Sequence, residues 1–162
     1  MQSFPAFGVE RRGAPVTAFL RFSEETILLR CEISAPDDLI VLDPTLIHAI
    51  DVTAGLKEGG RILINSDLPP AGYPDLVKRF RVATVDAGTI AQAHRLGSKT
   101  QPIVNTAILG ACAASLGYVS IDSVCRAIRD EIPVRPEDNV AAAREAAAAV
   151  RVAEPRKETS HA

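Results

Sequence analysis

Two adjacent arginines are the most distinctive chemical groups in this 162-residue sequence. Arg11 and Arg12 lie between Gly8 and Gly13, in a stretch whose glycines and prolines break both helix and strand patterns. Glycine lets a backbone approach a ligand closely, and planar guanidinium forks bind phosphate or carboxylate through paired hydrogen bonds. A structural use fits equally well, with Glu10 pairing one arginine while a partner chain contacts the other. The residues alone leave both interpretations open.

A second candidate is the pair Asn105 and Thr106, which stands at the start of an expected apolar helix. Backbone N–H groups at a helix N-terminus favour anions, so an amide and a hydroxyl there could meet a phosphate. Helix capping or turn formation explains the same two residue types at least as well.

Polar side chains also follow three short apolar runs, namely Asp43, Asn65 and Asp86. Ligands of open α/β sheets bind beyond the carboxyl ends of parallel strands, which makes these residues candidates for lining a crevice. The simpler interpretation, favoured here, is that each one caps the element that follows it.

No complete catalytic or metal-binding motif accompanies these candidates. The cysteines at 31, 112 and 125 form no C-x-x-C pair, and the three histidines are scattered. Clustered thiolates are needed for zinc or iron–sulfur ligation, so we expect reduced, structural cysteines and neither a metal site nor catalytic residues.

The amino-acid composition argues against several classes of function for this protein. Eighteen basic against twenty acidic residues give a net charge of −2, which argues against binding to nucleic acid or anionic membranes. No apolar run approaches the roughly 20 residues of a membrane span, and the first residues do not form a secretory signal. We therefore expect a cytoplasmic protein with one domain over residues 1–153, followed by a mobile polar tail over 154–162.

The elements that position the candidates begin with a hairpin. Residues 16–22 and 27–33 alternate apolar and polar side chains, and the polar residues 23–25 between them can turn the chain. Two alternating runs with a short link predict antiparallel strands with one buried face.

Further along, runs 39–42, 62–64 and 82–85 are apolar without alternation, which is typical of strands covered by helices on both faces. A helix over 44–50, with Asp43 placed to cap it, separates the first two and favours a parallel sheet.

From residue 88 onward the pattern is helical, with expected helices over 89–96, 102 or 103 to 116, 121–132 and from 136 onward. The helix ending at 116 is apolar all round and is expected to be buried. In the last helix, Val140, Ala143, Ala147 and Val150 form a narrow stripe suited to close approach of a neighbour.

The block from Phe4 to Val16 resembles the signature of the gamma subunit of pyruvate (2-oxoacid):ferredoxin oxidoreductases. The resemblance continues in order over roughly residues 3–135, through the blocks 39–46, 55–57, 64–66, 82–87, 90–91 and 102–111.

This resemblance implies a Rossmann-like, three-layer α/β domain with a partly parallel sheet, an antiparallel hairpin near the N-terminus and a helical C-terminal part. It implies a required, non-catalytic subunit of a complex that converts a 2-oxoacid and coenzyme A to acyl-coenzyme A and carbon dioxide, with reduction of ferredoxin. Alpha, beta and delta (ferredoxin-like) subunits would be its partners and would hold thiamine diphosphate, Mg2+ and 4Fe–4S clusters.

The resemblance also implies that the domain helps to form the coenzyme A end of the site. Arg11 and Arg12, with Asn105 and Thr106 behind them, are then the candidates for contacting coenzyme A or a partner subunit. Pyruvate is the expected substrate of the complex, and a branched-chain or aromatic 2-oxoacid is the alternative.

One departure from the family pattern stands out. Its members usually begin with a strand, a turn of the type G-x-G-G-Q-G and a helix, whereas this sequence starts at the phenylalanine–proline block. We expect an unpaired sheet edge or groove as the consequence.

Two further hypotheses for the function remain. One is a stand-alone nucleotide-binding module lined by Asp43, Asn65 and Asp86, and the other is a purely structural assembly subunit.

Overall fold

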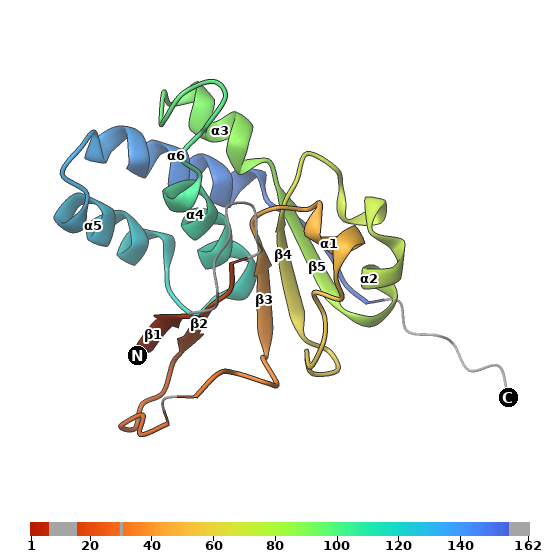
Figure 1. The fold of residues 1–162 in the computed structure, drawn as a ribbon. Coiled ribbons are helices and arrows are strands. Elements are labelled where there is room, and N and C mark those ends of the chain that lie inside the picture. The colour runs from red at the N-terminus through yellow and green to blue at the C-terminus, as the bar shows by residue number, and fades with distance from the viewer. Residues whose placement is uncertain (7–15, 30, 156–162) are drawn as a thin grey trace, which may run out of the picture.

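A computed structural model describes residues 1–6, 16–29 and 31–155 and contains two separate sheets (Figure 1). Strands β1 (Gln2–Pro5) and β2 (Ala18–Arg21) form a small antiparallel sheet. The larger sheet has four strands in the order β3-β4-β5-β6, and helices cover it. The expected α/β class, with an N-terminal hairpin and a helical C-terminal part, is confirmed.

The N-terminal hairpin uses a different partner strand from the one expected. β2 falls within the first alternating run, but it pairs with β1, in the register Ser3↔Leu20 and Phe4↔Phe19. The second run, 27–33, forms no strand in its described residues. Alternation marks a segment that can form a strand but does not identify its partner, and the Phe4 and Phe19 rings, 5.4 Å apart, pack across the observed pair.

Three parallel strands form most of the larger sheet: β3 (Asp38–Val41), β4 (Arg61–Asn65) and β5 (Arg81–Val85). β4 and β5 include the apolar runs 62–64 and 82–85 that predicted them, whereas β3 ends at Val41, one residue before the end of the run 39–42. Strand β6 (Arg151–Ala153) pairs antiparallel with β5 and was not expected, because three residues are too few to show an alternating pattern.

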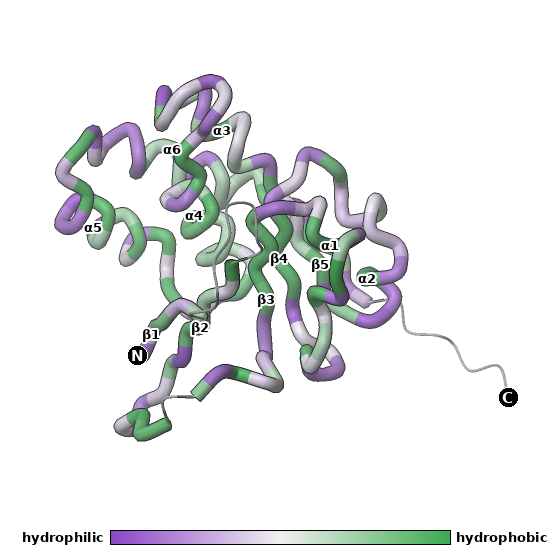
Figure 2. Tube along the Cα trace, viewed as in Figure 1, coloured by the Kyte–Doolittle hydropathy of each residue, from purple (hydrophilic) through white to green (hydrophobic). Residues whose placement is uncertain are grey.

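Alternate residues of these strands face two different cores. Ile62, Ile64 and Val82 pack on one face with residues of α1 (Leu46–Ala49) and α2 (Pro74–Arg79), near the 3-10 turn η1 (Pro70–Gly72). Leu63 and Val85 pack on the other face with residues of α3 (Ala87–Ala93), α4 (Asn105–Leu116) and α6 (Pro136–Ala149). Figure 2 shows the hydrophobic strands between these layers, as the three-layer prediction requires.

The C-terminal helices follow the predicted start and stop signals. The Ser120 side chain caps α5 (Ile121–Glu131) by accepting a hydrogen bond from Ser123 N, and Pro136 opens α6. Gly117 ends α4 with a φ of 73°. Helix α1 is shorter than predicted, and α4 begins two or three residues later than predicted.

The small residues of α4 and α6 allow these helices to pack closely. A Cβ on Gly110 would lie 1.9 Å from the Ala143 carbonyl oxygen, so the two backbones are almost in contact. Val140 and Ala143 of the predicted stripe are buried, but α4 is not buried all round, since Leu109 is 47% exposed. Part of this apolar helix therefore faces away from the core.

The last described residues remain tied to the domain. Glu154, the first residue of the expected tail, forms an ion pair of 2.9 Å with Arg81. The rest of that prediction concerns 156–162, which lie outside the described residues. None of the described helices combines the length and the apolar character that a membrane crossing requires.

Candidate functional site

The carboxyl ends of the parallel strands meet at one edge of the sheet, as expected, and Asn65 links them. Its side-chain amide donates to the Leu42 carbonyl at 3.1 Å, and its Oδ1 accepts from Ala87 N at 3.0 Å. Asn65 thereby joins the end of β3 to the start of α3. Both its side-chain nitrogen and its side-chain oxygen already have a hydrogen-bond partner.

Asp43 and Asp86 act as local caps at this edge. Asp43 Oδ1 accepts from Thr45 N at 3.0 Å and from Thr45 Oγ1 at 2.7 Å, and these bonds lower the pKa of Asp43 below its ordinary value. Asp86 Oδ1 accepts from Thr89 N at 2.9 Å. Two carboxylates at a sheet edge disfavour a phosphate there, so the geometry favours capping over nucleotide binding for these residues.

Asn105 and Thr106 lie together at the start of α4, but their side chains have different surroundings. The Thr106 hydroxyl is buried and donates to Asn139 Oδ1 on α6 at 2.8 Å, while the Asn139 amide donates to the carbonyls of Val134 and Arg135. Asn105 is exposed. Of this pair, Asn105 is therefore the residue positioned to meet a ligand, and Thr106 joins two helices.

Arg11 and Arg12 fall in 7–15, outside the described residues, so their predicted role stays a prediction. The structure does place both flanks of this stretch. β1 and β2 pair with each other, and Ala6 N donates to the Thr17 carbonyl at 2.8 Å beyond the last strand residues. The two ends of the arginine-bearing connection are thus fixed beside each other.

A charged cluster that the sequence analysis missed lies at the opposite edge of the main sheet. Arg61 binds Asp38 through two hydrogen bonds, Nε to Oδ1 at 2.5 Å and Nη2 to Oδ2 at 2.7 Å, and its Nη1 donates to the Leu116 carbonyl. The Tyr118 hydroxyl also donates to Asp38, which raises the pKa of Tyr118.

This cluster joins three parts of the fold. Asp38 and Arg61 begin adjacent strands, Leu116 ends α4, and the Tyr118 ring stacks on Phe22, 5.3 Å away, just beyond β2. The sequence signal for this cluster was the pair of opposite charges, Asp38 and Arg61, at the starts of two apolar strands. The charged groups of the cluster are paired with each other, and the Tyr118–Phe22 stack links the cluster to the chain just beyond β2.

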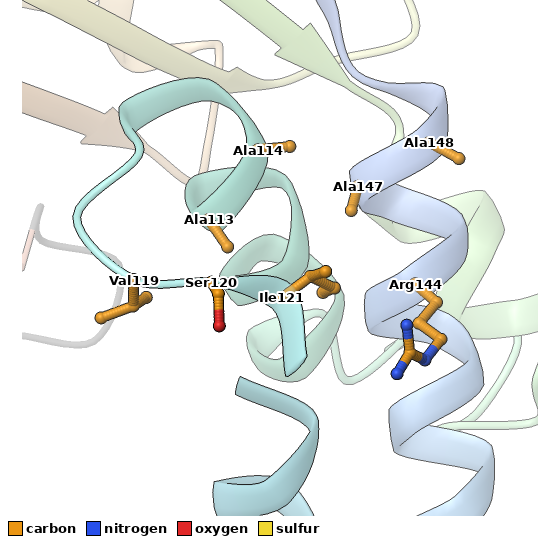
Figure 3. A pocket seen from close by; sticks show the side chains of 8 residues that line it. All are labelled: Ala113, Ala114, Val119, Ser120, Ile121, Arg144, Ala147 and Ala148. Carbon is orange, nitrogen blue, oxygen red and sulfur yellow. The ribbon is translucent and has the colours of Figure 1, made fainter. Parts of the chain in front are cut away.

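One hollow on the described surface lies between the end of α4, the start of α5 and α6 (Figure 3). It measures about 390 Å³ and is lined mainly by small apolar side chains, with Arg144 at one side. Arg144 is already paired with Asp122 at 2.8 Å. None of the predicted site residues lines this hollow, and the one hydroxyl in its walls, Ser120, caps α5 by accepting a hydrogen bond from Ser123 N.

The cysteines do not form a cofactor site in the described part of the chain. Cys31 is exposed, Cys125 is buried, and burial raises the pKa of the half-buried Cys112 thiol. Among residues 1–6, 16–29 and 31–155, no three side chains of His, Cys, Asp or Glu come together as metal ligands.

Comparisons with known proteins agree on one family. The family model described as "Pyruvate ferredoxin/flavodoxin oxidoreductase" matches residues 1–149. A protein of Pyrococcus abyssi named "Pyruvate/ketoisovalerate oxidoreductases common subunit gamma" is 48% identical over 149 residues, which cover 90% of this chain and 78% of the relative. "Pyruvate synthase subunit PorC" of Methanocaldococcus jannaschii is 47% identical over 129 residues, covering 80% and 67% of the two chains.

A solved structure is similar as well. The crystal structure of the pyruvate oxidoreductase subunit PORC from Thermotoga maritima superposes with a TM-score of 0.74 at 28% identity. The match covers 94% of this chain and 81% of the Thermotoga chain.

Proposed function

Because this chain belongs to the pyruvate ferredoxin/flavodoxin oxidoreductase family, we propose that it is the gamma-type subunit of a 2-oxoacid:ferredoxin oxidoreductase. The family match over residues 1–149 carries this conclusion, and it confirms the resemblance drawn from the sequence blocks. The complex decarboxylates a 2-oxoacid, most simply pyruvate, transfers the acyl group to coenzyme A and passes the electrons to ferredoxin.

The chemistry of this reaction belongs to cofactors that the described residues do not fit. Thiamine diphosphate with Mg2+ would stabilise the carbanion formed on decarboxylation, and 4Fe–4S clusters would carry the electrons. Family membership supports placing these cofactors on alpha, beta and delta subunits. The gamma-type chain then contributes shape, charge and contacts with those subunits.

Within the complex, we assign the coenzyme A end to the loop that carries Arg11 and Arg12. Coenzyme A bears several phosphates, and arginine forks bind phosphate through two hydrogen bonds at once. The paired strands on either side of residues 7–15 support this assignment, since a segment whose two ends are held together loses less entropy on binding. Exposed Asn105 is the second candidate contact.

Arginine substitution in the assembled complex tests this role. Arg11→Ala and Arg12→Ala are each expected to raise the KM for coenzyme A about tenfold, the loss of one charged hydrogen-bond pair, without lowering complex yield. Arg126→Ala is the control, because exposed Arg126 contacts only Ser123 among the described side chains. A lower yield with an unchanged KM would identify the arginines as interface contacts, and no change in either would contradict the assignment.

The choice of 2-oxoacid is assigned to other subunits. The Pyrococcus relative is named a common subunit of pyruvate and ketoisovalerate oxidoreductases, so its name couples one gamma chain to two acids. We propose that this chain, too, leaves the choice of 2-oxoacid to the other subunits of its complex.

A further inference from the structure

An exposed loop that follows β2 has no role in the site described above. It comprises Phe22–Leu29, hereafter the docking knob, and it extends from the hairpin beyond the start of β3 (Figure 1). Its last residues form a hydrophobic stretch on the outside of the molecule (Figure 2).

Leu28 and Leu29 are the most unusual residues of the docking knob. They are 85% and 65% exposed, although they are consecutive large apolar residues. At the other end of the docking knob, Phe22 stacks on Tyr118, and both rings are about half exposed. Large apolar side chains exposed together in this way are typical of a protein–protein contact.

The docking knob is held in place before any partner binds. The Arg21 guanidinium lies 3.4 Å from the Leu29 carbonyl and 3.4 Å from the Glu32 carbonyl, so it links the end of β2 to the returning chain. Ser23 Oγ accepts from Glu25 N at 3.0 Å and forms the turn, and Ile27 is half-buried. A preformed loop loses less conformational entropy on docking than a flexible one.

The charge of the docking knob indicates the chemistry of its partner. Glu24 and Glu25 are exposed, and neither forms an ion pair with any described residue. A surface that receives the leucines would therefore gain from basic side chains at its rim, since complementary charge speeds and orients association.

We propose that the docking knob inserts Leu28 and Leu29 into an apolar groove, edged by basic side chains, on another subunit of the oxidoreductase. This inference rests on the proposed function, because it requires a multi-subunit complex. The large exposure of both leucines, the preformed loop and the two acids, which form no ion pair among the described residues, all fit a partner surface better than a second copy of this acidic loop.

The intact complex provides the test. Leu28→Ser with Leu29→Ser is expected to weaken binding of this chain to the remaining subunits at least about tenfold, measured as the dissociation constant. The matched control is Val134→Ser with Leu68→Ser, which removes two exposed aliphatic side chains elsewhere and should change binding less than about twofold. Equal effects of the two double variants would overturn the proposal.

A second measurement identifies the occupant without weakening the fold. A photo-crosslinking residue at position 28 should capture another subunit next to basic residues, and Glu24→Lys with Glu25→Lys should reduce the salt dependence of binding. Capture of a second copy of this chain, or no capture in the intact complex, would overturn the proposal. Ferredoxin reduction by the wild-type complex tests the proposed function separately. Failure of the docking proposal can therefore be distinguished from failure of the proposed function.

Discussion

At the residue scale, the absence of one side chain and the presence of one hydrogen bond determine how closely α4 and α6 pack. Gly110 lets α4 approach α6 at Ala143, and the Thr106–Asn139 hydrogen bond joins the same helices one turn away. Neither contact involves the reacting molecules. Both are nevertheless needed to place Asn105 at the start of α4, so the candidate coenzyme A contact depends on a glycine and a buried hydroxyl.

Replacing Gly110 by alanine should destabilise the protein strongly. The added Cβ would meet the Ala143 carbonyl oxygen, a backbone atom that cannot move without separating the helices. We expect a loss of about 1–3 kcal/mol or more in the free energy of unfolding, measured by denaturant titration of the assembled complex beside the wild type.

Gly117→Ala is the matched control on the same helix. Gly117 has a φ of 73°, but a Cβ there would meet nothing within 4 Å, so only the backbone preference is lost, about 1 kcal/mol. If the two variants unfold at the same denaturant concentration, the close contact between α4 and α6 contributes little.

At the element scale, β3 is the strand most open to unwanted pairing. It pairs with β4 on one side only among the described strands, and Ile40 and Leu42 are 41% and 54% exposed. Edge strands of parallel sheets are usually covered by other parts of the protein. Otherwise their unpaired N–H and C=O groups and their apolar side chains can pair with a strand of another chain.

We expect the isolated chain to express poorly or aggregate. Ile40→Lys should slow aggregation, followed by light scattering, because a charge on an edge strand opposes pairing with another strand. Val134→Lys adds the same charge away from β3 and should leave the rate unchanged. A monodisperse wild-type chain that melts cooperatively would contradict the expectation.

At the scale of the whole molecule, the described surface offers several places for contact with other chains. The charged groups of the Asp38 cluster are paired, and apolar surface is exposed at the docking knob, at β3 and on α4. A subunit that works through its neighbours has these properties, since its exposed apolar surface is buried only on assembly.

The purified chain alone should therefore not turn over any 2-oxoacid. The measurement is release of carbon dioxide with coenzyme A and an artificial electron acceptor present, and adding the remaining subunits of the complex is the positive control. Turnover by the chain without companions or prosthetic groups would contradict its assignment as a gamma-type subunit.

The sequence determined the elements whose signals are local. The apolar runs of β3, β4 and β5, the Ser120 cap and the Pro136 start of α6 were all predictable, because propensity and capping depend on residues close together in the chain. The family blocks likewise lie in continuous segments, so the resemblance was visible without a fold.

Only the tertiary structure decided which surfaces meet. The alternation in 16–22 did not reveal that β1, rather than 27–33, is the partner of β2. The helix pattern did not show that Thr106 bonds Asn139, 33 residues away, or that Leu109 stays exposed. Such outcomes depend on packing between segments that are distant in the chain, and a local pattern contains no information about which of several apolar surfaces will be covered.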